Sequence, residues 1–141
     1  MTERCFPAAL DQLDMVQQFV LDQLAGHSYS ERIRAQLDVA VEEIFVNIAH
    51  YAYPPDKPGW ARIRCQVDPD PLQITIQFID QGVPFNPLAK PDADITLSAE
   101  ERKIGGLGIL MVKRSMDQVL YAYEDGQNIL TLVKRIASVP S

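Results

Sequence analysis

Cysteine and histidine are scarce in this sequence, which has two of each among 141 residues. Cys5 and Cys65 stand far apart, and neither histidine pairs with them at the spacing of a metal site. This excludes a metal-binding module built on these residue types. It predicts two free thiols, as expected for a protein in a reducing cytosol.

Long apolar runs are also missing. No segment approaches the roughly 20 consecutive apolar residues that a membrane helix needs. The first ten residues lack the basic segment followed by an apolar one that marks a secretory signal. We therefore expect a cytoplasmic protein that does not enter a membrane.

Basic residues are outnumbered, with 13 Lys and Arg against 19 Asp and Glu and a formal net charge of −6. This balance argues against non-specific binding to nucleic acid or to an anionic membrane, because both need an excess of Lys and Arg. A single nucleotide can still be held by local backbone N–H groups. With 47% hydrophobic residues, the length fits one globular domain over residues 1–141.

Apolar spacing predicts two helices in the first part of the chain. Residues 8–24 carry apolar side chains at helical intervals. Ser30 is a predicted N-cap for a second helix, which continues to about Tyr53. Pro54 and Pro55 then stop this helix.

Alternating apolar residues predict two pairs of strands, at residues 61–67 and 72–79 and at residues 120–123 and 128–133. The second pair has Asp125-Gly126 as its turn signal, and a glycine-led helix precedes it. The order helix, helix, strand, strand, loop, helix, strand, strand predicts an α/β two-layer sandwich with an antiparallel-rich sheet.

Residues 81–103 show no clear period and are rich in proline, aspartate and small polar residues. A stretch of this length without regular structure is typical of a functional or mobile loop. We predict that it forms a lid.

Glu43 and Asn47 are four residues apart on the second predicted helix, so their side chains share one face. A glutamate can orient a hydroxyl group and accept its proton, and an asparagine oxygen suits magnesium. Taken alone, the pair is also compatible with a solvated polar face.

Asp80 ends an apolar strand and is followed by Gly82. The carboxylate can accept a hydrogen bond from an exocyclic amine such as that of adenine, and a glycine allows a close backbone approach. The plainer alternative is an ordinary Asp-x-Gly turn at a strand end.

The glycine-rich string Gly105, Gly106, Leu107 and Gly108 stands at the start of the third predicted helix. A helix N-terminus with free N–H groups is suited to bind phosphate. Arg102 and Lys103 precede the string and can reach outer phosphates, or they form a solvated basic pair.

The three motifs occur in an order that resembles a known family. The strings EEIFVNIAHYAY, FIDQGVPFNPL, GGLGILMVKRSMDQVLY and DGQNILTLVKR together resemble the small serine kinases that double as anti-sigma factors. These kinases belong to the Bergerat-fold ATPase superfamily of gyrase and histidine kinases. The resemblance covers nearly the whole chain and implies a mixed, mostly antiparallel sheet covered on one face by about three helices.

The resemblance also implies roles for single residues. Glu43 matches the catalytic base and Asn47 the Mg²⁺ ligand, while Asp80 matches the adenine-binding aspartate. Gly82 and the glycines of the string from Gly105 to Gly108 match the nucleotide-loop glycines. The chain departs from the superfamily at Pro84, where many members have a second glycine, and its first strand can only be residues 2–6.

Family members bind ATP, commonly form homodimers, bind a sigma factor and phosphorylate a serine of a STAS-type anti-anti-sigma protein. Two functions therefore stay open for this chain. The first is an ATP- and Mg²⁺-dependent protein serine/threonine kinase and anti-sigma factor. The second is a nucleotide-binding interaction module that sequesters a partner without phosphotransfer. An intact Glu43 favours the kinase, because binding alone has less need of a base beside a metal.

Overall fold

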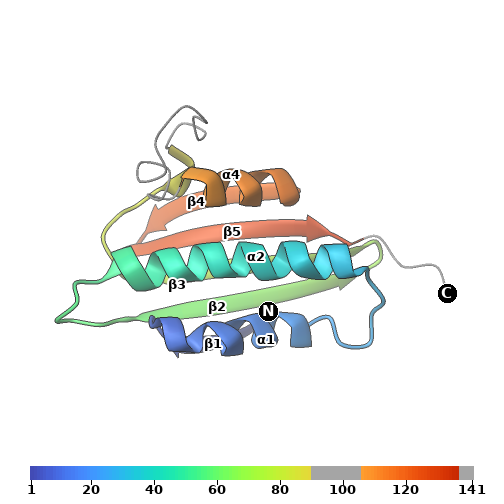
Figure 1. The fold of residues 1–141 in the computed structure, drawn as a ribbon, viewed down its shortest axis with the longest axis horizontal. Helices are drawn as coiled ribbons and strands as arrows, with labels where there is room; N and C mark the ends of the chain where they lie inside the picture. The colour runs from blue at the N-terminus through green and yellow to red at the C-terminus, as the bar shows by residue number, and fades with distance from the viewer. Residues whose placement is uncertain (90–105, 137–141) are drawn as a thin grey trace.

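The structure is a computed structural model that describes residues 1–89 and 106–136 (Figure 1). The helices and strands are, in chain order, β1 (Thr2–Pro7), α1 (Leu13–Asp22), α2 (Glu31–Asn47), β2 (Trp60–Pro69), β3 (Leu72–Asp80), α4 (Gly106–Ser115), β4 (Gln118–Glu124) and β5 (Gln127–Arg135).

One five-stranded sheet has the order β1-β2-β3-β5-β4. In the described part of the chain, each of the pairings in this order is antiparallel. The resemblance had implied a mixed, mostly antiparallel sheet, so the observed sheet is more uniform than expected. The register of β3 with β5 places Asp80 opposite Asn128. The expected first strand is present as β1, at the edge of the sheet.

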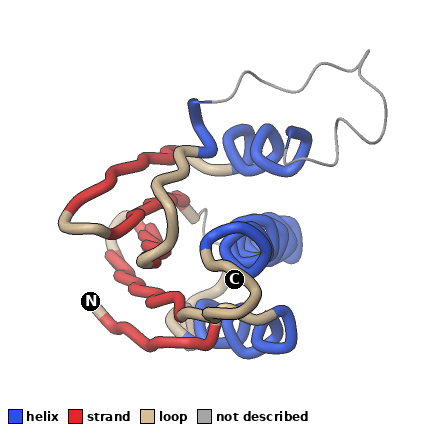
Figure 2. Tube along the Cα trace, turned by 90° about the vertical axis from the view of Figure 1, so that its left-hand side faces the viewer, coloured by secondary structure: helices blue, strands red, loops and turns tan. Residues whose placement is uncertain are grey.

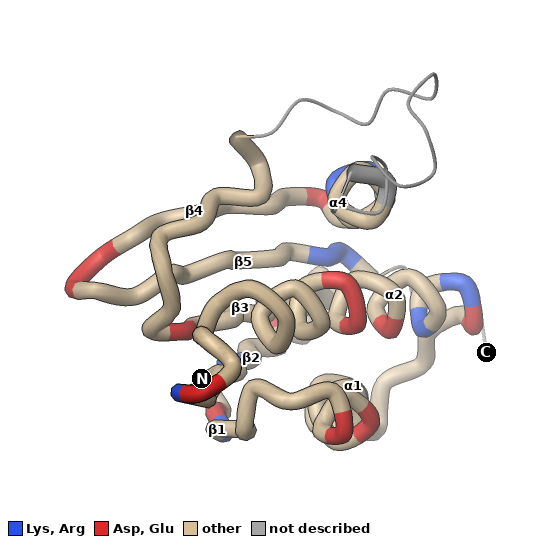
Figure 3. The backbone as a smooth tube through the Cα atoms, turned by 60° about the vertical axis from the view of Figure 1, so that its left-hand side comes forward, with Lys and Arg blue, Asp and Glu red and all other residues tan. Residues whose placement is uncertain are grey.

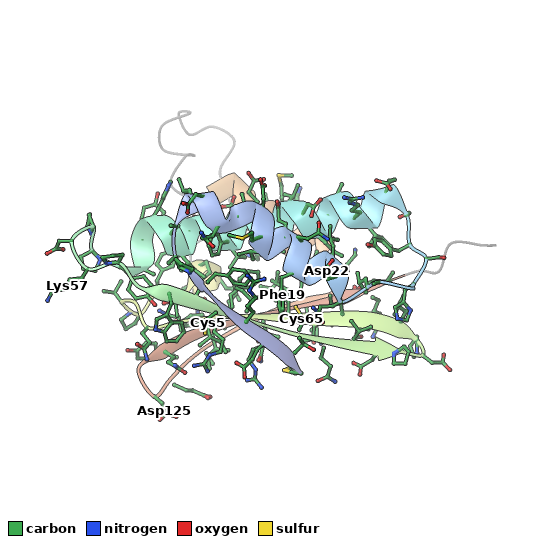
Figure 4. All side chains as sticks on the ribbon, turned by 90° about the horizontal axis from the view of Figure 1, so that it is seen from below. Cys5, Phe19, Asp22, Lys57, Cys65 and Asp125 are labelled. Carbon is green, nitrogen blue, oxygen red and sulfur yellow. The ribbon has the colours of Figure 1, made fainter. Side chains whose placement is uncertain are left out.

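The helices α1, α2 and α4 lie together on one face of the sheet (Figure 2). This confirms the predicted two-layer α/β sandwich. The core fills the space between the layers, and it includes Val41 and Phe45 of α2 and Ile76 and Phe78 of β3, each at most 1% exposed. On α1, Phe19 meets the ring of Phe6 from β1 edge-on, with centroids 5.9 Å apart (Figure 4).

Two local sequence signals are confirmed. The Ser30 hydroxyl accepts a hydrogen bond from the backbone N–H of Ile33 at 3.2 Å, which is the N-cap expected for α2. Asp125 and Gly126 both have positive φ, at 52° and 76°, which fits the tight hairpin turn between β4 and β5.

Two boundaries differ from the prediction. Helix α1 begins at Leu13 rather than near residue 8, because Ala9 is extended and a short 3₁₀ turn follows it at Leu10–Gln12. The end of α2 widens into a π-helical turn at Ile48–Ala52, a feature that apolar spacing does not reveal. The predicted lid, residues 81–103, lies mostly outside the described residues, and only its first part, to residue 89, can be placed.

Cys5 and Cys65 are both free thiols, as predicted, but their environments differ (Figure 4). Cys5 is exposed, whereas Cys65 is 2% exposed and burial raises its pKa to about 12. The thiolate is the reactive form.

We expect a maleimide at pH 7 to label Cys5 readily and Cys65 at least ~100-fold more slowly, because Cys65 is both covered and protonated. Mass spectrometry of the variants Cys5→Ser and Cys65→Ser would measure the two rates. In urea the rates should become similar. Rapid labelling of Cys65 in the folded protein would contradict its burial.

Candidate functional site

A pocket of about 480 Å³, including its open mouth, lies where the end of α2 meets β3 and β5. Its walls are apolar and include Ile44, Ile48, Phe78 and Leu130. Asn47, Asp80 and Asn128 add polar groups to this lining. An apolar pocket with a few convergent polar groups is the usual form of a small-molecule site.

Asp80 lies at the end of β3 and is only 5% exposed. Its Oδ1 accepts hydrogen bonds from the backbone N–H of Gly82 at 2.8 Å and from Asn128 Nδ2 at 3.0 Å. The side chain is therefore held on one of its two oxygens. A carboxylate fixed in this way offers an acceptor to a ligand in the pocket.

Glu43 and Asn47 lie one turn apart on α2, and the Asn47 amide donates to Glu43 Oε1 at 3.5 Å. The i, i+4 spacing has thus brought them together as predicted. Because the amide N–H of Asn47 faces the carboxylate, its carbonyl oxygen is left for another partner. Asn47 also lines the pocket, and Glu43 lies beside it, one turn back along α2.

Burial raises the pKa of Glu43, the hydrogen bond from Asn47 lowers it, and the charge of Glu42 raises it. The net direction is upward. A carboxylate with a raised pKa is a better proton acceptor than an exposed one, which fits the role of a general base.

Helix α4 approaches Glu43 closely at Gly108. A Cβ atom at position 108 would lie 2.0 Å from Glu43 Cδ and 2.2 Å from each carboxylate oxygen. Any larger residue at position 108 would therefore displace the Glu43 carboxylate from this position. From its motif, Gly108 was predicted only to bind phosphate, and its contact with Glu43 adds a second reason for a glycine at this position.

Gly82 packs against the π-helical turn at the end of α2. A Cβ atom there would lie 2.3 Å from the carbonyl oxygen of Ala52 and 2.6 Å from its Cβ. The N–H of Val83 donates to the same carbonyl oxygen at 3.2 Å. The Tyr53 hydroxyl accepts from the N–H of Gln81 at 2.8 Å, so the turn after Asp80 is attached both to the π-helical turn that continues α2 and to the residue after it.

We expect Gly82→Ala to destabilise the protein by about 1–3 kcal/mol, because the added methyl group collides with backbone atoms of Ala52. The same substitution should also lower the affinity for any ligand that binds to Asp80. Urea unfolding and calorimetric titration would measure the two effects. The control is Gly26→Ala, where φ is +85° and nothing lies within 4 Å of the new methyl group. That variant should lose stability without losing ligand affinity, and equal affinity losses in both variants would contradict this account.

The remaining predicted residues lie near the start of α4 or before it. Gly106 begins α4 and Leu107 is in its first turn. Arg102, Lys103 and Gly105 lie outside the described residues. Their assignment to phosphate binding therefore stays a prediction.

Asn128 and Tyr121 are two pocket residues that were not predicted from the sequence. Asn128 is 6% exposed and bonds directly to Asp80. A signal for it was present, because the alternation that turns Leu130 and Leu132 inward also turns residue 128 inward. A polar residue at an inward position of a strand needs a partner.

Acidic residues recur along α1 and α2, whereas the basic residues of α2 lie near its start (Figure 3). The pocket lies at the other end of α2, away from those basic residues.

None of the helices in the described part of the chain is long and apolar enough to span a membrane.

The sequence and the fold correspond to a known domain class. Residues 6–134 match the family described as the histidine kinase-like ATPase domain, and the chain belongs to this family. A domain of this class binds ATP. The buried acceptor on Asp80 and the apolar walls fit the base of that nucleotide, since adenine offers an amine donor and a flat apolar surface.

Several curated proteins resemble the chain in sequence. It is 26% identical over 109 residues to the serine/threonine-protein kinase BtrW of Bordetella bronchiseptica, over 77% of this chain and 75% of that protein. It is 28% identical over 110 residues to the serine-protein kinase RsbW of Listeria monocytogenes, over 75% and 68% of the two chains. The RsbW of Bacillus licheniformis is 31% identical over 108 residues, 74% of this chain and 65% of that protein.

A solved structure shares the fold. The crystal structure of the RsbU and RsbW domains of Rv1364c from Mycobacterium tuberculosis superimposes with a TM-score of 0.66 at 16% identity. The match covers 100% of this chain but 34% of that longer chain. The similarity confirms the architecture of one sheet covered by helices. The names of the sequence relatives indicate protein serine kinases at the level of the family.

Proposed function

We propose that this protein is an ATP-dependent protein serine kinase that acts as an anti-sigma factor in a bacterial partner-switching system. Its phosphate acceptor would be a serine of a STAS-type anti-anti-sigma protein, and its second partner a sigma factor or another regulator. The observation that carries the proposal is that Asn47, which is hydrogen-bonded to Glu43, lines the same pocket as Asp80.

Each site residue has a part in this proposal. Asp80 would bind the adenine amine, and Asn47 would offer its carbonyl oxygen to Mg²⁺, which neutralises phosphate charge when it is bound. Glu43 would accept the proton of the substrate serine. Its raised pKa supports this part.

The backbone around Gly106, Leu107 and Gly108 would hold the phosphates at the N-terminus of α4, with Gly105, Arg102 and Lys103 before it. Gly82 would keep the turn beside the base close to α2. The end of α2 that lines the pocket carries no Lys or Arg, which supports this use of backbone N–H groups.

We further propose that the protein forms a homodimer. In the described sheet β1 is an edge strand that pairs with β2 on one side, so its other edge is open to a second strand. Analytical ultracentrifugation of the protein with and without ATP would measure its oligomeric state. A monomer at all concentrations tested would contradict the dimer.

The kinase is tested by incubating the protein with labelled ATP, Mg²⁺ and STAS-type proteins from the same genome. Transfer of label to a serine of one of them supports the proposal. Binding of ATP and of a partner without transfer would instead favour an interaction module that sequesters its partner. Failure to bind ATP at all would overturn both.

A further inference from the structure

Asn128 is a buried polar residue whose side chain forms hydrogen bonds with several neighbours. Among the described residues, Asp80 and Asn128 are the two buried polar or charged side chains, at 5% and 6% exposed. They face each other across the β3–β5 pairing. A buried amide is tolerated only when its donors and acceptors are satisfied, so its partners define its purpose.

Both ends of the Asn128 amide are fixed. Its Oδ1 accepts from the N–H of Phe85 at 3.1 Å and from the hydroxyl of Tyr121. Its Nδ2 donates to Asp80 Oδ1 at 3.0 Å and to the carbonyl oxygen of Val83 at 2.9 Å. A backbone N–H can only donate and a backbone carbonyl can only accept, so the amide can have one orientation only.

This orientation of the Asn128 amide determines which oxygen of the Asp80 carboxylate stays available to a ligand. Asp80 Oδ1 already receives two donors, from Asn128 and from the N–H of Gly82. The other carboxylate oxygen is then the acceptor that remains for a ligand in the pocket. Without Asn128, the Asp80 side chain would lose one of these two anchors and could turn.

Asn128 also holds the segment that follows Asp80. It bonds to the peptide groups on both sides of Pro84, through the carbonyl of Val83 and the N–H of Phe85. Pro84 has no N–H of its own. Val83 and Phe85 both line the pocket, so one side chain sets the Asp80 carboxylate and this part of the wall together.

We propose that Asn128, supported by Tyr121, is a positioning residue that determines base specificity in this pocket. It holds Asp80 so that a free carboxylate oxygen meets the exocyclic amine of a purine. The site then favours 6-aminopurines over 6-oxopurines, in which an acceptor replaces that amine. This inference rests on the proposed binding of ATP.

The test compares the affinities of ATP and ITP, which share the triphosphate and sugar but differ at the 6-position. We expect the parent protein to prefer ATP by about 10–100-fold, because ITP leaves acceptor facing acceptor. Asn128→Asp keeps the size but faces Asp80 with a second acceptor. It should lower the ATP to ITP ratio at least about fivefold, mostly through ATP.

Two further variants keep the test decisive. Tyr121→Phe removes one hydroxyl and should lower the same ratio by a smaller factor, which tests the inference even if Asn128→Asp does not fold. Thr131→Val is the matched control, because it lies on β5 and loses one hydrogen bond, from Gln77 at 3.3 Å, on the opposite face of the sheet. It should leave the ratio unchanged.

The outcomes separate the two proposals. A parental ratio in folded Asn128→Asp, or in Tyr121→Phe if the former does not fold, overturns the positioning role, since a merely structural residue would weaken both nucleotides alike. Equal binding of ATP and ITP by the parent also overturns it but leaves ATP binding standing. If the parent binds neither nucleotide, the proposed function fails and the inference fails with it.

Discussion

Glu43→Gln is expected to retain affinity for ATP and for a protein partner but to reduce phosphotransfer by about 10²–10⁴-fold. Glutamine keeps the size and the hydrogen-bonding ability of the side chain, and it still fits beside Gly108. It cannot accept the proton of a serine hydroxyl. Single-turnover transfer of labelled phosphate to a STAS-type protein would measure the rate, and calorimetry would measure the affinity.

Glu42→Gln is the matched control, because Glu42 is the adjacent residue on α2 and is exposed. It should transfer phosphate at close to the parental rate. If Glu43→Gln is as fast as the parent, Glu43 is not the base. Equal losses in both variants would point instead to a general effect of charge.

The raised pKa of Glu43 adds a pH dependence to this result. The base works only when ionised, so the parental rate should fall as the pH drops through a value above that of an ordinary glutamate. Between the unfolded and folded pKa values the folded state binds more protons, so ionising Glu43 lowers stability as the pH rises through that window. Glu43→Gln should therefore unfold at the parental temperature or slightly above it at neutral pH.

Asp80→Asn is expected to reduce ATP affinity by about 10–100-fold. The Oδ1 of the new amide can keep the hydrogen bonds from Gly82 and Asn128, which places its N–H group toward the pocket. A donor would then face the amine donor of adenine. The same change should improve the relative binding of ITP, whose 6-oxo group is an acceptor.

Asp68→Asn makes the same chemical change on β2, where the carboxylate receives an exposed hydrogen bond from Gln66. Its ATP affinity should match that of the parent. Calorimetry on both variants, with circular dichroism to confirm folding, decides the matter. Unchanged ATP binding in Asp80→Asn would remove Asp80 from the nucleotide site.

The local parts of this fold could be predicted from the sequence because their causes are local. The N-cap at Ser30 and the turn at Asp125-Gly126 depend on side-chain and backbone preferences of adjacent residues. Likewise, the Glu43–Asn47 pair follows from the geometry of a single helix. These elements needed no knowledge of the tertiary structure.

The other contacts depend on which elements become neighbours, and periodicity does not specify this. Asn128 reaches Asp80 only because β5, rather than β4, pairs with β3. The contact of Gly108 with Glu43 requires α4 to pack beside α2. Gly82 was predicted to allow a close approach to a base, and this stays a prediction. The structure adds a close contact of Gly82 with Ala52, at a π-helical turn that apolar spacing does not predict.

The close packing of Gly82 on Ala52 fixes the position of the turn after Asp80 relative to α2 and the π-helical turn that continues it. Glu43 and Asn47 lie further back on α2, so their distance from Asp80 is also fixed. If the nucleotide binds as proposed, an analogue with a longer or shorter span between its base and its phosphates would not reach Asp80 and the Glu43–Asn47 pair at the same time. Among the described lining residues, Tyr51, Val83 and Phe85 are 53%, 61% and 37% exposed, so they form an open rim of the pocket. Inhibitors of this protein should therefore keep the dimensions of ATP and gain their selectivity by extending outward over that rim.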